Sequence, residues 1–145
     1  VPEDRKSQGL FLGLPIRNNV TIAVLDRLAN YGLIDRRREI ETVQHAQDSL
    51  SITMASPDQE VQYLSGGNQQ KVVLARWLET SPVVVILDEP TRGIDVGAKF
   101  EIYHLIRELT ERGVGVFPPV VQQWRCAVGA RLCQGAKAGV CPQAF

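Results

Sequence analysis

The stretch from Val83 to Asp95, VVVILDEPTRGID, has the strongest bearing on the fold. Its opening run, Val83 to Leu87, is entirely apolar and shows no alternation, which is typical of a parallel strand buried on both faces. Asp88 and Glu89 follow that run directly. Open α/β sheets bind ligands at the carboxyl ends of their strands, so this acidic pair is either a ligand site or simply the beginning of a loop.

A carboxylate at the end of such a strand has a recognisable chemical use. It can hold Mg²⁺, directly or through water, while the ion bridges the phosphates of a nucleotide. A neighbouring carboxylate can orient or deprotonate an attacking water. Asp88 and Glu89 therefore form a candidate pair for metal binding and general base catalysis.

A second motif, LSGGNQQK from Leu64 to Lys71, precedes the apolar run. Ser65 can cap a helix, and the backbone N–H groups at a helix start carry a partial positive charge that favours phosphate. Gly66 and Gly67 have no side chains and so allow close approach to the backbone. The motif alone fits either a phosphate site or an ordinary capped helix.

Hydrophobic periodicity predicts helices on both sides of the apolar run. Apolar residues at helical spacing indicate the first helix, which Asn18 or Asn19 could cap and Gly32 could end. Gly113 is a natural residue to follow the last helix. Helices alternating with a buried strand indicate an α/β layer structure. The predicted helices span residues 18–32, 36–50, 65–80 and 96–112, and a further strand spans 114–117.

The composition excludes some classes of protein. The 145 residues carry 16 basic and 16 acidic side chains, which gives no indication of nucleic-acid binding. The longest apolar run is far shorter than the roughly 20 residues of a membrane helix. The three cysteines, Cys126, Cys133 and Cys141, lie in an acid-free tail. Their odd number and their spacing predict free thiols, not a disulfide framework or a zinc site.

The two motifs together resemble the ABC ATPase family, in which an LSGGQ-type signature precedes the Walker B strand by one helix. The strings LSGGNQQKVVLARWL and LDEPTRGIDVGAKFEIY are similar to the second nucleotide-binding domain of monosaccharide importer ATPases, of the ribose, galactose and xylose types. The upstream stretches VPEDRKSQGL and LPIRNNVT also resemble that domain, so the resemblance covers about residues 1–116. It implies an α/β fold: a partial P-loop NTPase domain with a parallel sheet core and a helical subdomain.

The resemblance also implies roles for individual residues. The signature would contact the γ-phosphate of an ATP whose P-loop lies on an opposing domain, and the Walker B carboxylates would serve this domain's own site. The implied site residues are Ser65, Gly66, Gly67 and Asn68 of the signature, Asp88 for Mg²⁺, Glu89 as general base, Asp95 of the D-loop, and Glu3 at the Q-loop position.

Further expectations concern organisation and partners. The family pairs such a domain with membrane permease subunits and an opposing nucleotide-binding domain, and indirectly with a periplasmic sugar-binding protein. We therefore expect ATP and Mg²⁺ as cofactors, no nucleic acid, and a peripheral location on the cytoplasmic face of the plasma membrane. The implied regions are 1–13, Q-loop-like; 14–80, helical subdomain ending in the signature helix; 81–116, Walker B strand, D-loop and following helix; and 117–145, a divergent tail.

The chain also departs from the family pattern. It contains no GxxxxGK[ST] motif, so we expect the P-loop strand and Walker A to lie upstream of Val1 and the chain to be a fragment. The switch histidine is missing, and His45 and His104 are expected at the surface. From Phe117 onward we expect a shifted reading frame or a truncated gene, with a divergent genuine tail as the alternative. The expected function is ATP hydrolysis for sugar import; the alternative is an inactive fragment.

Overall fold

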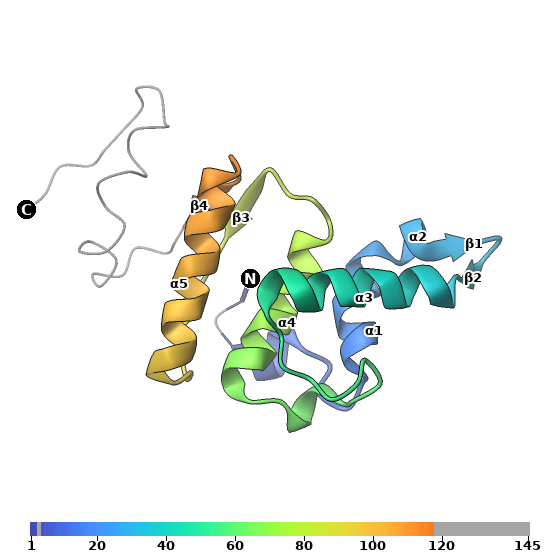
Figure 1. The fold of residues 1–145 in the computed structure, drawn as a ribbon, viewed down its shortest axis with the longest axis horizontal. Coiled ribbons are helices and arrows are strands. Elements are labelled where there is room, and N and C mark those ends of the chain that lie inside the picture. The colour runs from blue at the N-terminus through green and yellow to red at the C-terminus, as the bar shows by residue number, and fades with distance from the viewer. Residues whose placement is uncertain (3, 118–145) are drawn as a thin grey trace, which may run out of the picture.

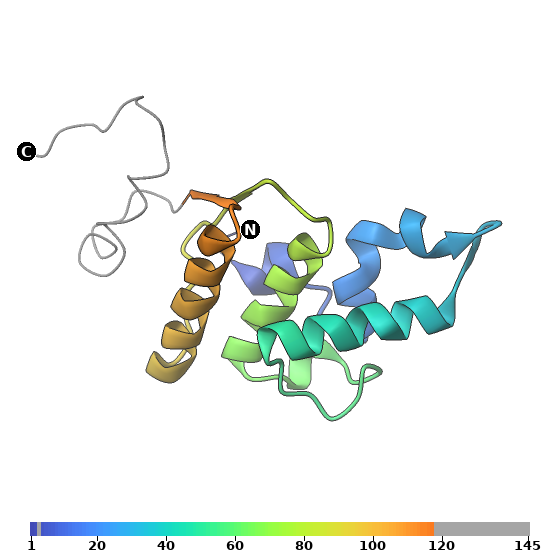
Figure 2. The ribbon, with the colours of Figure 1, turned by 45° about the horizontal axis from the view of Figure 1, so that its top comes forward.

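The computed structural model describes residues 1–2 and 4–117 and places helix α4 (Gly66–Leu78) at the centre of the molecule. Helix α5 and strands β3 and β4 lie at one end, and the β1–β2 hairpin lies at the other (Figures 1 and 2). The elements are η1 (Arg5–Gly9), α1 (Ile16–Thr21), η2 (Ile22–Val24), α2 (Leu25–Leu28), β1 (Ala29–Asn30), β2 (Leu33–Ile34), α3 (Arg36–Leu50), η3 (Val61–Tyr63), α4, β3 (Val84–Ile86), α5 (Val96–Glu111) and β4 (Gly115–Phe117).

Strands β3 and β4 form a parallel pair joined through α5, as the α/β prediction requires. Their register aligns Val84 with Gly115 and Ile86 with Phe117. The other edge of β3 is also paired: the nitrogen of Val1 donates to the Ile86 carbonyl at 2.8 Å, and the Asp88 nitrogen donates to the Val1 carbonyl at 3.0 Å. These two hydrogen bonds have the pattern of parallel pairing, so Val1 lies along the edge of β3 opposite β4, although the assigned sheet has two strands.

The prediction that both faces of β3 are buried is wrong for the described residues. Val85 and Leu87 are buried and belong to the same hydrophobic cluster as Ile102 of α5. Val84 and Ile86, which point to the opposite face, are 47% and 66% exposed. Successive side chains of a strand point to opposite faces, and the described helices cover only one of them.

The predicted helix over residues 18–32 is also wrong in its bounds. It begins earlier, after Pro15, changes to a 3₁₀ turn at η2, and ends with α2 at Leu28. The chain then forms the β1–β2 hairpin, whose two loop residues, Tyr31 and Gly32, have φ values of 52° and 81°. Positive φ at both loop residues is characteristic of a type I′ hairpin turn, which ends the helical path.

The other predicted helices are confirmed, and each begins at a side chain that caps it. The carboxylate of Asp35 accepts hydrogen bonds from two backbone N–H groups at the start of α3. Ser65 accepts one such hydrogen bond at the start of α4, and Asp95 accepts one at the start of α5. Such caps satisfy donors that have no partner within the helix. Gly113, with φ of 88°, follows α5 as predicted.

Asn19 is not the helix cap that its sequence position suggests. Its side chain is fully buried, and its Oδ1 accepts hydrogen bonds from the Phe11 nitrogen at 2.9 Å and from Arg76 Nη2 at 2.8 Å. Its Nδ2 donates to the Phe11 carbonyl at 2.9 Å, and also to the carbonyls of Leu14 and Pro15. The amide therefore fixes the loop before α1 to α4.

Arg76 completes this arrangement from α4. Its Nε donates to the Asn19 carbonyl at 2.7 Å, and its guanidinium lies 5.5 Å from the centre of the Phe11 ring. Burial lowers the pKa of the Arg76 guanidinium, because the charged form loses contact with water. The positive charge of Arg76 is stabilised by the Asn19 carbonyl oxygen and by the π electrons of the Phe11 ring.

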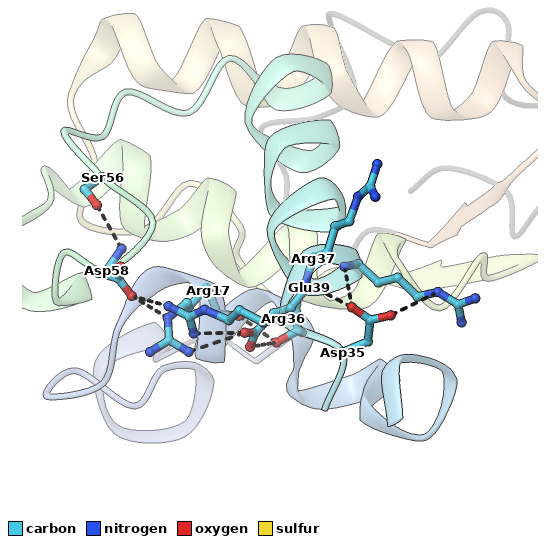
Figure 3. A network of polar contacts seen from close by, with 9 residues as sticks. Arg17, Asp35, Arg36, Arg37, Glu39, Ser56 and Asp58 are labelled. Carbon is cyan, nitrogen blue, oxygen red and sulfur yellow. Dashed lines mark hydrogen bonds and ion pairs between the residues drawn. The ribbon is translucent and has the colours of Figure 1, made fainter. Parts of the chain in front are cut away.

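A second polar network joins α1, α3 and the loop before η3 (Figure 3). Glu39 is buried, and its carboxylate pairs with Arg17 at 3.4 Å and Arg36 at 3.1 Å. Both arginines also pair with Asp58. Arginine side chains at residues 17 and 36 are thus held by carboxylates from two segments, which fixes the loop against the helices.

We predict that Asn19→Ala lowers the free energy of unfolding by about 2–4 kcal/mol, because it leaves several buried polar groups without partners. Chemical denaturation followed by circular dichroism would measure this. The control is Asn18→Ala, because the Oδ1 of Asn18 is buried without a partner among the described residues. We expect that control to change stability by no more than about 0.5 kcal/mol. Equal losses from the two variants would contradict the role given to Asn19.

A second prediction concerns Asp58. The hydrogen bond from Arg17 lowers the pKa of the Asp58 carboxyl, and Arg36 acts in the same direction. The interaction therefore stabilises the fold above the ordinary carboxyl pKa and is lost as the pH falls through the lowered value. NMR titration should show the Asp58 pKa moving upward in Arg17→Ala. An unchanged midpoint in that variant would contradict the assignment.

Candidate functional site

The start of α4 presents an exposed hydroxyl. Ser65 Oγ accepts a hydrogen bond from the Asn68 nitrogen at 3.3 Å and another from Asn68 Nδ2 at 3.1 Å, and the Ser65 residue is exposed. Asn68 Oδ1 accepts from the Thr53 nitrogen at 2.9 Å. The side chain of Asn68 therefore joins the first turn of α4 to the segment that follows α3.

The two glycines of this turn pack closely against other parts of the chain. A Cβ atom on Gly66 would lie 2.8 Å from Arg5 Nη2 and 3.3 Å from the Gly93 carbonyl oxygen. A Cβ atom on Gly67 would lie 2.6 Å from the Cβ of Ala98. Cβ atoms do not approach each other as closely as 2.6 Å, so the backbone of α4 can meet Ala98 only because residue 67 is a glycine. A side chain at residue 66 would require the end of the Arg5 side chain to move.

Asp95 lies in the segment that meets α4. Its Oδ1 accepts a hydrogen bond from the Ala98 nitrogen at 2.9 Å and so caps α5. Because Gly67 packs directly on Ala98, the structure brings the first turn of α4 (the signature turn, Ser65 to Asn68) next to the start of α5, where the resemblance predicts the D-loop residue Asp95.

Arg5, in the N-terminal segment, also contacts the first turn of α4 and the loop before α5. The sequence patterns did not single out this residue. Its Nη1 donates to the Arg92 carbonyl at 2.8 Å, and its Nη2 donates to the Gly93 carbonyl at 3.1 Å. Its Nε lies 3.5 Å from Gln69 Oε1. Arg5 sits in a polar opening stretch without periodicity, so the sequence offers no signal that its side chain is buried.

Asp88 and Glu89 lie at the carboxyl end of β3, as predicted. Asp88 is exposed, and within residues 1–2 and 4–117 no hydrogen bond or ion pair engages either carboxylate group. Glu89 has a φ of 40°, in the left-handed region of backbone conformation that residues other than glycine rarely adopt. Backbone strain of this kind is common where a side chain must be held in a particular direction.

The carboxylates fit Mg²⁺ only if a further ligand completes the site. In the described part of the chain, no group of three or more His, Cys, Asp or Glu side chains is placed to hold a metal ion. Mg²⁺ is commonly held by one or two carboxylates together with substrate phosphates and water. Asp88 is exposed and Glu89 partly exposed at the end of β3, and the Val1 ammonium interacts electrostatically with Asp88, so among the described residues both carboxylates lie where such a ligand set could form.

The remaining predicted residues have simpler outcomes. His45 lies 3.3 Å from Glu79, and His104 lies 3.4 Å from Glu108; both histidines are exposed, as expected. Glu3 and the three tail cysteines lie outside the described residues. None of the described helices is long and apolar enough to cross a membrane.

Comparison with family models supports the resemblance. The model described as ABC transporter matches residues 5–92, more than half of the chain. This match includes the signature turn and the Asp88–Glu89 pair.

Individual relatives are similar over a longer stretch. The chain is 53% identical over 116 residues to the xylose import ATP-binding protein XylG of Paraburkholderia xenovorans (strain LB400). It is also 53% identical over 116 residues to the ribose import ATP-binding protein RbsA of Bacillus subtilis (strain 168). Each match covers 80% of this chain but only 22% and 24% of the relatives, so the chain spans about a quarter of their length.

Solved structures support the fold. A dimeric ATP-binding cassette bound to ADP and phosphate matches with a TM-score of 0.61 and 24% identity, over 77% of this chain and 48% of that chain. The dimeric structure of a bacterial ABC transporter cassette matches with a TM-score of 0.62 and 24% identity, over 75% and 47%. The predicted α/β fold, with a parallel sheet and helices arranged as in part of an ATP-binding cassette, is confirmed by these neighbours.

The packing at Gly67 generates a prediction. Gly67→Ala should lower the free energy of unfolding by about 1–3 kcal/mol, because the new methyl group would overlap Ala98. Gly97→Ala is a matched control, since Gly97 occupies the same second helical position in α5 and its Cβ would meet only Asp95 Oδ1 at 3.4 Å. We expect the control to leave thermal and chemical denaturation midpoints unchanged or slightly raised. A loss of similar size at both positions would contradict the packing argument.

Proposed function

Because the chain belongs to the ABC transporter family, we propose that it is part of an ATP-binding subunit that energises import of a monosaccharide. The observation that carries this proposal is the order and placement of two motifs: Ser65 caps α4, and Asp88 and Glu89 follow β3. The ribose and xylose import proteins at 53% identity support the choice of sugar import.

The signature turn would serve a nucleotide held by an opposing domain. Ser65, Gly66 and Gly67 would face the γ-phosphate, with Asn68 beside them, while the P-loop of the other domain holds the rest of the nucleotide. The exposed Ser65 hydroxyl and the N-terminus of a 13-residue helix suit a phosphate oxygen. Asp95, at the start of α5 next to this turn, would communicate across the dimer.

Asp88 and Glu89 would serve this domain's own site, which a P-loop would complete. Asp88 would hold Mg²⁺, and bound Mg²⁺ would neutralise charge on the phosphates. Glu89 would accept the proton of the attacking water or orient that water. Glu3, at the Q-loop position, would belong to the same site.

The proposed organisation follows the regions expected from the sequence. Residues 14–80 would form the helical subdomain that faces the permease, and residues 1–13 and 81–116 would belong to the ATPase core. The partners would be permease subunits and an opposing nucleotide-binding domain, with a periplasmic sugar-binding protein acting indirectly. The subunit would lie at the cytoplasmic face of the inner membrane as a peripheral protein.

A second proposal concerns the 145-residue polypeptide by itself. Its sequence contains no GxxxxGK[ST] motif, and that loop supplies the main phosphate cradle and a lysine in P-loop proteins. We propose that the isolated chain has no ATPase activity of its own. A phosphate-release assay with Mg-ATP tests this: hydrolysis by the isolated chain would contradict the proposal.

The catalytic assignment is testable in a hybrid subunit. The matching 116-residue segment of the Bacillus subtilis ribose import ATP-binding protein would be replaced by that of this chain. With the other ATP site of the hybrid inactivated, Glu89→Gln should lower hydrolysis by about 10²–10⁴-fold while Mg-ATP still binds, because a positioned base contributes a factor of that order.

The control for this experiment is Glu41→Gln, which removes an exposed carboxylate that pairs with Arg37 on α3. We expect it to leave the hydrolysis rate unchanged. Full turnover in Glu89→Gln would show that Glu89 is not the base.

A further inference from the structure

We propose that Arg5 is a positioning residue that sets the spacing between the signature turn and the loop before α5. This inference rests on the proposed function, because it concerns the two elements that would share an ATP with the opposing domain. It also makes a geometric claim about the chain alone, which is testable without nucleotide.

The guanidinium of Arg5 lies between two glycines from distant parts of the chain. A Cβ on Gly66 would lie 2.8 Å from Nη2, and a Cβ on Gly93 would lie 3.6 Å from Nη1 and 3.8 Å from Nη2. Both backbones therefore close around one planar group. Gly93 also has a φ of 65°, which disfavours any other residue at that position.

The hydrogen bonds of Arg5 fix the direction of this contact. Two different nitrogens donate to two successive carbonyls, those of Arg92 and Gly93, and the third nitrogen faces Gln69 of α4. Arg5 is only 9% exposed, so water contributes little to satisfying these groups. A rigid fork that donates to adjacent acceptors holds the loop in one orientation, which the single ammonium of a lysine cannot do.

The consequence concerns Ser65 and Asp95. Each lies next to a segment that Arg5 contacts: Ser65 precedes Gly66, and Asp95 follows Gly93 by two residues. A signature hydroxyl and a D-loop carboxylate that reach one nucleotide must keep a fixed separation, because small displacements of positioning groups lower reaction rates strongly. In the described part of the chain, Arg5 is a buried side chain that contacts the segments carrying both of them.

The first test uses NMR spectra of the 145-residue chain. Arg5→Ala should move the amide resonances of residues 66–68 and 93–96 together, and Arg5→Lys should move those of residues 93–96. The control, Arg27→Ala, removes an exposed arginine that donates to the Glu79 carbonyl and should move neither group. Unmoved resonances at 93–96 in both Arg5 variants would overturn the proposal.

A double-mutant cycle tests the packing directly. Gly66→Ala should lower the denaturation midpoint in the parent chain, because the methyl group would overlap the guanidinium. The same change should lower the midpoint by less than half as much when Arg5 is already alanine or lysine, since the obstructing group is gone or displaced. Additive losses in both backgrounds would mean that Arg5 does not occupy the space above Gly66.

The final arm uses the hybrid subunit. Arg5→Lys should lower kcat about 10-fold while the KM for Mg-ATP stays within about two-fold, because the change affects alignment of the shared site and not the phosphate cradle. An inactive parent hybrid would count against the proposed function. The NMR spectra and the double-mutant cycle would then still test whether Arg5 holds the two segments together. An active hybrid with unchanged kcat in Arg5→Lys would overturn the positioning role.

Discussion

The structure depends on one constraint: helix α4 is buried, yet it carries polar side chains whose donors must find acceptors. Gln69 donates to the Val61 carbonyl, Lys71 to the Ser51 carbonyl at 2.8 Å, and Arg76 to the Asn19 carbonyl at 2.7 Å. These acceptors belong to three separate segments. A buried donor without a partner destabilises a fold by more than a made hydrogen bond stabilises it, so the surrounding segments are held to one rotation of α4.

The same constraint organises the candidate site. Because α4 is fixed along its length, its first turn meets the segment from Gly93 to Ala98 at a distance that only glycines allow. The signature motif thus has two explanations that do not compete. Its glycines fit the packing within the chain, and its exposed serine and helix N-terminus suit a phosphate from outside.

Features that depend on neighbouring residues, such as helix caps, could be predicted from the sequence. Contacts between residues far apart in the sequence could not. Asp35, Ser65 and Asp95 each cap the helix that follows them, so the bounds of α3, α4 and α5 could be predicted closely. Asn19 contacts Arg76, which lies 57 positions away in the sequence, and Arg5 contacts Arg92, which lies 87 positions away. Hydrophobic periodicity does not reveal contacts between such distant residues. The motifs likewise identified the candidate site residues, but the contact between the signature turn and the loop before α5 required the fold.

The one-sided burial of β3 has a consequence for the behaviour of the polypeptide in solution. Val84, Ile86 and Phe117 present apolar side chains on paired strands, where they are 47%, 66% and 62% exposed. Short runs of β-branched and aromatic residues without charge favour association between copies of a chain. Expression of this polypeptide alone therefore carries a risk of aggregation, and a charged residue at one of these positions would be the natural remedy for handling it at high concentration.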